Sequence, residues 1–108
     1  MKEYFIDTDE MKSREISRGV KIKVVSGERL MLSYVDVSTE TEMVLHSHSH
    51  EQAGIVLEGE VEFTIGSETR IVNSGQSYLI PAYVPHGIRT RTGARFLDIF
   101  SPPREDYR

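Results

Sequence analysis

Apolar and polar residues alternate along several short stretches of this chain, which is the pattern of strands with one buried face. In the clearest stretch, Val20, Ile22 and Val24 alternate with two lysines, and residues 60–65 repeat the pattern. Short polar or glycine-containing breaks separate these stretches. The pattern predicts strands over 20–25, 29–37, 54–57, 60–65, 70–72, 77–80, 86–91 and 95–100, and another that begins at residue 43.

The segments between these strands are predicted to be turns and loops. Residues 58–60, with the sequence Glu-Gly-Glu, are expected to turn the chain, so that 54–57 and 60–65 form two hairpin arms. Residues 38–42 are expected to be a loop, and residues 8–15 could form a helix capped by Asp7 or Thr8. Many short strands with glycine turns predict an all-β sandwich or barrel, in which closure removes exposed strand edges.

Composition and charge limit the metal ligands and the binding partners that this chain can have. The chain has no cysteine, so a bound metal would need nitrogen and oxygen ligands. A net charge of -4 gives no basic stripe for nucleic acid, although Arg89, Arg91 and Arg95 cluster late in the chain. Apolar runs are short, and the first residues lack the pattern of a secretory signal. We therefore expect a cytoplasmic protein without nucleic-acid or membrane partners.

Three of the four histidines lie within five residues, at His46, His48 and His50, and Gln52 continues the same spacing. On one extended strand all four side chains would point to the same face. Crowded imidazoles are costly if buried without a partner, whereas a divalent metal binds them in their neutral form. The fourth histidine, His86, follows a stiff proline-containing loop that could bring it to the same place. The alternative is an exposed histidine-rich stretch that binds metal only adventitiously.

These residues resemble the two motifs of the cupin family. The matching positions are His46-x-His48, Gln52 and Gly59 in the first motif, and Gly75, Pro81 and His86 in the second. The resemblance implies a cupin fold, which is a double-stranded β-helix (jelly-roll) barrel, with one metal ion on His46, His48, Gln52 and His86. Zinc, nickel, manganese, iron or copper would suit such ligands. In the alternative register, with His48 and His50 as the pair, Gly54 falls at the fourth position and offers no ligand.

The family pattern usually has glutamate where this chain has Gln52. Three neutral imidazoles and a neutral amide leave the charge of a divalent ion uncompensated, which favours an anionic ligand. We therefore expect a small carboxylate as the substrate.

The last predicted strand carries Asp98 between apolar neighbours. Such a residue either bonds to an amide or an arginine, or serves as an acid or base whose pKa is raised by burial. Residues 46–52 and 96–107 resemble the KdgF-type cupins of pectin degradation, which linearise 4,5-unsaturated uronates to 4-deoxy-5-keto uronates. The resemblance implies that Asp98 and Arg104 are catalytic and that Phe100 lines the pocket. We also place Tyr83 and Arg91 among the substrate contacts, and Tyr78 and Tyr83 are rival proton carriers.

The predicted function is therefore metal-dependent linearisation of an unsaturated uronate, with the metal as Lewis acid and Asp98 as proton shuttle. Other readings remain open: a metal-dependent dioxygenase, an aldol catalyst like the polyketide cyclases, or a non-enzymatic cupin that binds a sugar acid. We expect one cupin domain over 1–108, with an arm at about 1–18, a barrel at about 19–101 and a tail at 102–108. We also expect a homodimer, because apolar residues in the arm (Tyr4, Phe5 and Ile6) could cover a second copy.

Overall fold

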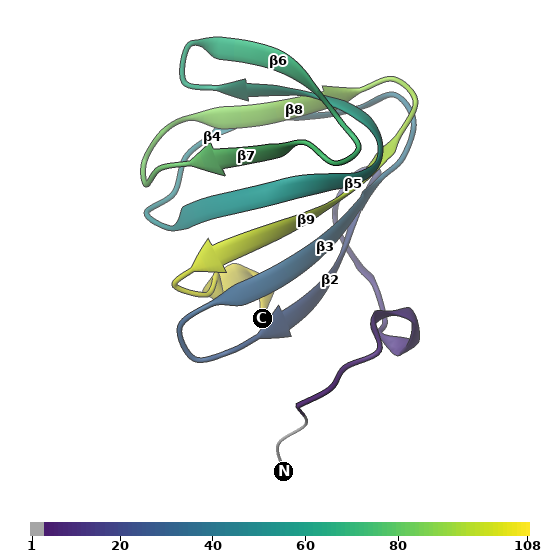
Figure 1. Ribbon diagram of the computed structural model, residues 1–108, viewed down its shortest axis with the longest axis vertical. Coiled ribbons are helices and arrows are strands. Elements are labelled where there is room, and N and C mark those ends of the chain that lie inside the picture. The colour runs from purple at the N-terminus through teal and green to yellow at the C-terminus, as the bar shows by residue number, and fades with distance from the viewer. Residues whose placement is uncertain (1–3) are drawn as a thin grey trace.

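The computed structural model describes residues 4–108, and antiparallel β-strands make up most of it (Figure 1). Residues 1–3 of the predicted arm lie outside the described part. In chain order the elements are η1 (Thr8–Glu10), β1 (Arg14–Ser17), β2 (Val20–Ser26), β3 (Met31–Val37), β4 (Thr41–His46), β5 (Glu51–Ile65), β6 (Glu68–Asn73), β7 (Ser77–Ile80), β8 (His86–Thr90), β9 (Ala94–Ser101) and η2 (Glu105–Tyr107). The predicted all-β class is confirmed.

The strands form one strongly curled sheet in the order β1-β2-β3-β9-β5-β8-β4, with β6 and β7 also paired to β5. β3 pairs with β9, and β4 pairs with β8, so strands far apart in the sequence are neighbours in space. The sheet curls so that its two halves face each other, as Figure 1 shows. This brings the inward side chains of both halves into one interior.

β5 is a single long strand, so the predicted turn at 58–60 is wrong. Its first half pairs with β9 and β7, and its second half pairs with β6 and β8. Between the halves, Val56 pairs with Phe96 and Glu58 pairs with Arg95, which leaves Leu57 as a β-bulge. Gly59 follows with a φ of +81°. Bulges and glycines bend strands, and here they let β5 pass from one half of the sheet to the other without a turn.

The N-terminal segment also differs from the prediction. Only residues 8–10 are helical, as a 3-10 turn whose cap is Asp7, which accepts a 3.0 Å hydrogen bond from the backbone N–H of Asp9. The predicted helix over 8–15 is wrong beyond this turn, because Arg14–Ser17 pairs with β2 instead. The predicted loop over 38–42 is shorter, since β4 already begins at Thr41.

The interior changes from apolar to polar along the strands. The inward residues of β9 are Ala94, Phe96, Asp98 and Phe100, all of them buried. Around Phe96 lies an apolar core in which the rings of Phe63 and Tyr78 approach to 4.1 Å between centroids. Beyond Asp98 the interior carries polar side chains. The buried titratable side chains His86 and Asp98 therefore lie toward one end of the barrel, whereas the buried hydroxyls of Thr41 and Thr90 lie where β4 and β8 pair at its other end.

In the described part of the chain, no helix is long and apolar enough to cross a membrane.

Candidate metal centre

Three histidines meet at the polar end of the barrel although they come from different elements. His46 ends β4, His48 lies in the connection to β5, and His86 begins β8. The ring of His86 lies 4.4 Å from that of His46 and 4.8 Å from that of His48, between centroids. One ligand atom from each ring lies within 4.8 Å of the others, so the three could hold a metal ion.

The connection between β4 and β5 replaces the single extended strand that we predicted over residues 46–52, and that prediction is wrong. β4 ends at His46 and β5 begins at Glu51. The connection is held in place because the backbone N–H of Tyr83 donates to the His48 carbonyl oxygen at 2.8 Å. His50 lies outside the three-histidine cluster, with its ring 5.3 Å from that of His48.

Each of the three histidines uses its Nδ1 atom to bond to a backbone carbonyl oxygen. His46 bonds to Val44 at 3.3 Å, His48 bonds to His50 at 3.0 Å, and His86 bonds to Val84 at 2.9 Å. A carbonyl only accepts, so Nδ1 carries the proton and the lone pair of the neutral ring is on Nε2. The backbone therefore orients all three rings as metal ligands normally are.

The amide of Gln52 completes this set of donors. Gln52 is buried on β5, and its Oε1 atom lies 3.0 Å from Nε2 of His48. The Nε2 atom of His86 is buried and has no hydrogen-bond partner among the described residues. Three imidazole nitrogens and one amide oxygen suit a divalent transition metal. The structure thus brings together the four side chains predicted as ligands, and they fit the ion that the motif implies.

Burial keeps the two inner histidines neutral. It lowers the pKa of His86 to about 4, and it also lowers the pKa of His48, with the charge of Arg104 as the next cause. Histidine binds a metal only in its neutral form. These two ligands are therefore ready to bind at neutral pH.

Asp98 lies beside the candidate ligands and is held by Tyr78. The hydroxyl of Tyr78 donates to Asp98 Oδ1 at 2.5 Å, and both side chains are buried. Burial raises the pKa of Asp98 to about 7, although hydrogen bonds from Tyr78 and Gln52 and the charge of Arg104 act in the opposite direction. A carboxyl group with such a pKa can both hold and release a proton near neutral pH.

Gly54 makes this arrangement possible, and sequence reasoning did not identify it. It pairs with both Tyr78 and Asp98 across β7 and β9. A Cβ atom at this position would collide with the Tyr78 hydroxyl and would lie 2.6 Å from Asp98 Oδ1. A glycine inside a strand is the sequence signal of such a close approach.

Arg104 closes one side of the site. Its guanidinium lies 3.9 Å from the centroid of the Tyr107 ring and 5.2 Å from that of Phe100. It also contacts the Asp106 carboxylate through two nitrogens, at 2.9 and 3.3 Å. Tyr107 is thus a further site residue, missed because a lone tyrosine in a tail gives no periodic signal. Arg104 is held in a geometry that recognises carboxylates.

Two spaces adjoin the ligands. An inner cavity of about 40 Å³ is lined by His46, Gln52, His86 and Asp98 among others, with Phe100 and Arg104 at its wall. A water molecule occupies about 30 Å³, so this cavity suits an ion and a small group rather than a whole sugar. An outer groove of about 610 Å³ shares His46, Arg104 and Tyr107 with it.

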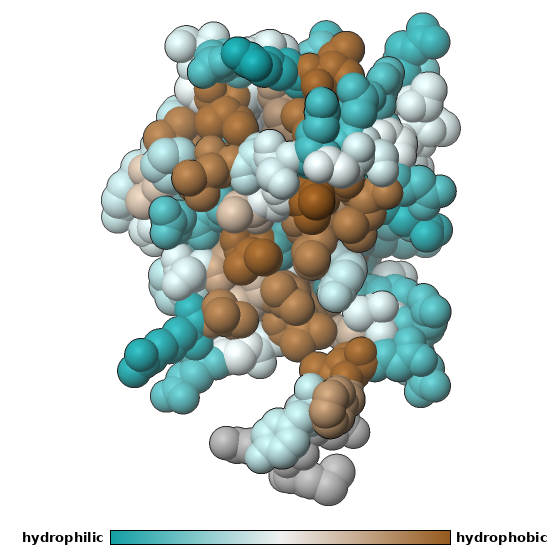
Figure 2. All heavy atoms as spheres, viewed as in Figure 1, coloured by the Kyte–Doolittle hydropathy of each residue, from teal (hydrophilic) through white to brown (hydrophobic). Residues whose placement is uncertain are grey.

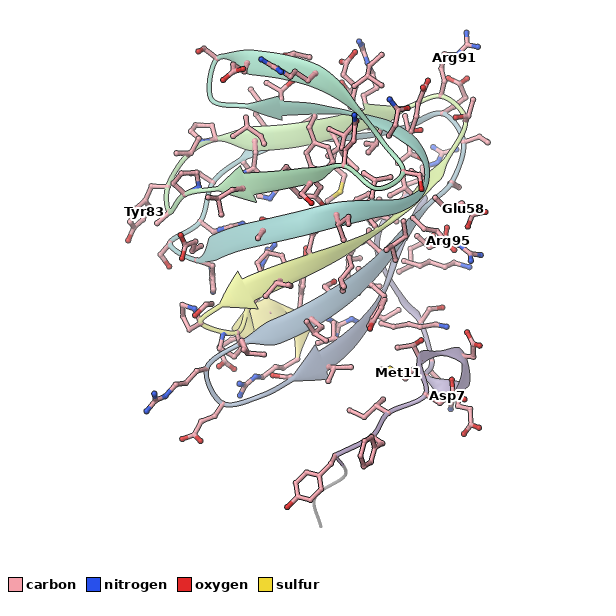
Figure 3. All side chains as sticks on the ribbon, in the orientation of Figure 1. Asp7, Met11, Glu58, Tyr83, Arg91 and Arg95 are labelled. Atoms are coloured by element: carbon pink, nitrogen blue, oxygen red, sulfur yellow. The ribbon has the colours of Figure 1, made fainter. Side chains whose placement is uncertain are left out.

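Two residues predicted as substrate contacts are not brought to this site. The side chain of Tyr83 is 71% exposed, and Figure 3 shows it pointing outward from the loop before β8. Arg91 follows the other end of β8, at the opposite end of the molecule in the same view. A strand carries the chain away from His86 before Arg91, and the loop before β8 turns the Tyr83 side chain outward. Their role as substrate contacts stays a prediction.

Comparison with known proteins identifies the family to which this chain belongs. Residues 33–100 match the cupin domain family (Cupin_2). This match covers more than half of the chain, and the chain therefore belongs to the cupin family.

Particular relatives are similar over nearly the whole chain. The chain is 33% identical over 110 residues to the pectin degradation protein KdgF of Dickeya dadantii (strain 3937), with 99% of each sequence covered. It is 38% identical over 71 residues to an H2HPP isomerase of Bacillus subtilis, covering 65% of this chain and 29% of that protein.

Solved structures agree with these sequence relationships. An RmlC-like cupin from Shewanella frigidimarina NCIMB 400 has a TM-score of 0.94 and 29% identity, with 99% of this chain and 97% of that chain covered. KdgF from Halomonas sp. has a TM-score of 0.91 and 26% identity, with 96% and 99% covered. The predicted cupin barrel and the likeness to KdgF-type cupins are confirmed.

Proposed function

We propose that this cupin is an enzyme of pectin degradation that linearises 4,5-unsaturated uronates to 4-deoxy-5-keto uronates. The observation that carries the proposal is that candidate metal ligands and a buried acid share one cavity. His46, Gln52 and His86 line it together with Asp98 and Arg104, and His48 completes the ligand set beside Gln52. The similarity to two KdgF proteins supports the substrate class.

The reaction is an isomerisation and therefore needs no oxidant. A proton leaves the hydroxyl on carbon one, the bond between carbon one and the ring oxygen breaks, and a proton adds to carbon four. The atoms of the substrate and of the product are the same. The relative that is an H2HPP isomerase supports this kind of chemistry over an oxygen-dependent one.

His46, His48, His86 and Gln52 would hold one divalent metal, which when bound supplies Lewis-acid polarisation of substrate oxygens. Asp98 would hold the proton that is delivered to carbon four, because its raised pKa lets it carry a proton near neutral pH. Tyr78 keeps Asp98 in one orientation through its hydrogen bond. Arg104 would pair with the substrate carboxylate, and Phe100 would exclude water from the reacting end.

The test is to mix the metal-loaded protein with a 4,5-unsaturated galacturonate and follow the loss of the enol-ether absorbance. We expect the wild type to exceed the uncatalysed rate, and Asp98→Asn to lower kcat by about 100-fold or more, the usual contribution of a general acid or base. Asp36→Asn, on the exposed face of β3, is the matched control and should react like the wild type.

A wild-type rate no higher than that of buffer would exclude the uronate reaction. An Asp98→Asn rate equal to that of the wild type would exclude only the role of Asp98. Oxygen uptake by the metal-loaded protein, measured in parallel, would favour the dioxygenase alternative.

A further inference from the structure

The charged groups that concern an anionic substrate lie on the inner side of the sheet, beside the turn η2. Figure 2 shows that apolar side chains occupy the middle of the outer face, and such a surface does not attract carboxylates. On the other side, η2 packs behind β9 and β3 (Figure 1), and Tyr107 in this turn packs against the core. Arg104, which precedes the turn, lines both the inner cavity and the outer groove. Binding of an anion therefore depends on how this turn holds Arg104.

Asp106 occupies one edge of the Arg104 guanidinium. Its carboxylate accepts hydrogen bonds from Nη2 at 2.9 Å and from Nε at 3.3 Å, and the Tyr107 hydroxyl accepts one from Nη1 at 3.0 Å. A guanidinium has five N–H groups in a rigid fork, so these contacts leave one N–H on each of the two terminal nitrogens. A substrate carboxylate can bind at this second edge without displacing Asp106, because arginine binds carboxylates through two parallel hydrogen bonds.

The position of Arg104 depends on the charge of Asp106. The side chain of Arg104 is only 13% exposed, whereas that of Asp106 is 62% exposed. Asp106 thus compensates a largely buried positive charge from the solvent side. Without this carboxylate the guanidinium would be drawn outward to water, because a buried charge is costly unless it is paired and a long side chain can carry its charged end to solvent.

A second arginine, from a distant part of the sequence, fixes the backbone of Asp106. Arg14 on β1 donates from Nη2 to the Asp106 carbonyl oxygen at 3.2 Å and from Nη1 to the Arg108 carbonyl oxygen at 3.4 Å. Arg108 in turn donates from Nε to Ser26 Oγ at 3.1 Å. A single 3-10 turn has weak internal hydrogen bonds, so these contacts with β1 and β2 determine where the turn lies.

We propose that Asp106 is a positioning residue, itself held by Arg14, that keeps the guanidinium of Arg104 ready to bind a substrate carboxylate. The proposal rests on the proposed function only for the identity of the substrate. An arginine side chain loses rotamer freedom when it binds a ligand, and a guanidinium that is already held in place avoids most of this cost. The opposite role, in which Asp106 competes with the substrate for Arg104, predicts the opposite change in KM.

The first measurement is steady-state kinetics of the metal-loaded protein with a 4,5-unsaturated galacturonate. Asp106→Ala should raise KM about 10-fold, the cost of ordering one long side chain. It should leave kcat within about twofold of the wild type, because the carboxylate contact is the same in the ground state and in the transition state. Arg14→Ala should change KM in the same direction, and the double variant should be no worse than Asp106→Ala, because both changes act through one contact. Asp106→Glu, which keeps the carboxylate, should recover part of the loss.

Glu105→Ala is the matched control, because Glu105 lies in the same turn but its carboxylate contacts Arg108, at 3.5 Å, rather than Arg104. Such an exposed pair contributes little, so KM should stay at the wild-type value. Thermal unfolding should show that all variants are folded. A lower KM for Asp106→Ala would overturn the proposal, because Asp106 would then be a competitor of the substrate. An unchanged KM would overturn it as well.

The second measurement needs no substrate and follows Arg104 directly. In a proton–nitrogen correlation spectrum, the Nε–H signal of Arg104 is identified by its absence in Arg104→Lys. This signal should exchange slowly with water in the wild type and in Glu105→Ala, because Asp106 accepts the hydrogen bond, and it should be lost through fast exchange in Asp106→Ala. If the wild type does not act on the uronate, the proposed function fails and this spectrum alone decides: a signal that persists in Asp106→Ala overturns the positioning role.

Discussion

Gly54 shows at the scale of one residue how the fold makes room for the candidate chemistry. The space that a side chain would fill is taken by the Tyr78 hydroxyl and the Asp98 carboxylate. Both groups are buried, and their mutual hydrogen bond removes the cost of burying them unpaired. The position of Asp98 therefore depends on a residue of another strand that makes no chemical contribution itself.

Gly54→Ala is expected to displace Asp98 and to impair catalysis more than stability. A methyl group here forces the Tyr78 and Asp98 side chains apart, which should lower kcat on the unsaturated uronate by about 100-fold and the free energy of unfolding by about 1 to 3 kcal/mol. Steady-state kinetics and denaturant unfolding measure the two effects. Gly27→Ala, in the β2–β3 hairpin, should keep the wild-type kcat. Equal kcat values for the two variants would contradict this role of Gly54.

The four candidate ligands show how far sequence could lead at this scale. The spacing of His46, His48 and Gln52 pointed to one metal site, and the structure gathers these side chains around His86. The structural basis of the site differs from the prediction, because the loop between β4 and β5, and not one face of a single strand, brings these side chains together. Which side chains a loop turns inward depends on backbone hydrogen bonds such as that from Tyr83 to His48, and no local sequence pattern encodes these.

At the scale of elements, β5 determines how the two halves of the sheet are joined. The bulge at Leu57 and the positive φ of Gly59 turn its direction while the strand continues. In the sequence, Glu58-Gly59-Glu60 has the composition of a turn, because turns and glycine bulges both need a residue that tolerates positive φ. Only the pairing partners distinguish the two, and these lie far away in the chain. Most other strands were predicted because alternation is a local property.

Two glycine variants should separate the steric demand at the bulge from the demand for positive φ. Gly59 and Gly66 both have positive φ, but a Cβ atom on Gly59 would lie 2.5 Å from the Gly93 carbonyl oxygen, whereas one on Gly66 has ordinary contacts. Gly66→Ala should cost about 1 kcal/mol of unfolding free energy from backbone strain alone. Gly59→Ala should cost about 2 kcal/mol more, because the clash adds to it. Urea unfolding measures both, and equal losses would show that the Gly93 contact is unimportant.

At the scale of the whole molecule, the apolar core and the candidate metal centre occupy different ends of one barrel. The core residues pack on one another around Val56, Phe63 and Phe96. His46 and His86 stand at the ends of strands that this core already holds in place, and His48 lies in the short connection between two such strands. The barrel is therefore expected to remain folded without metal, and metal binding is expected to raise its stability further.

Metal removal should lower the thermal midpoint without unfolding the protein at room temperature. At a metal concentration about 100 times the dissociation constant, binding adds about 2.7 kcal/mol, which corresponds to a rise of roughly 10 °C or more. Thermal unfolding with a chelator and with added zinc or nickel measures this shift. His46→Ala should lose the shift, and His50→Ala should retain it. The reverse result would show that the ligands follow the other register.

The pairing of β3 with β9 and of β4 with β8 has a consequence for the order in which this protein is made. During synthesis, His46 and His48 are made well before His86. β3 cannot pair on its β9 side until β9, the last strand in chain order, has been made. Before β8 is made, the emerging chain has His46 and His48 without His86, and until β9 is made the edge of β3 stays unpaired. Such long-range pairing makes folding slow. The ion is thus expected to enter a nearly complete barrel, rather than to serve as the nucleus around which the barrel forms.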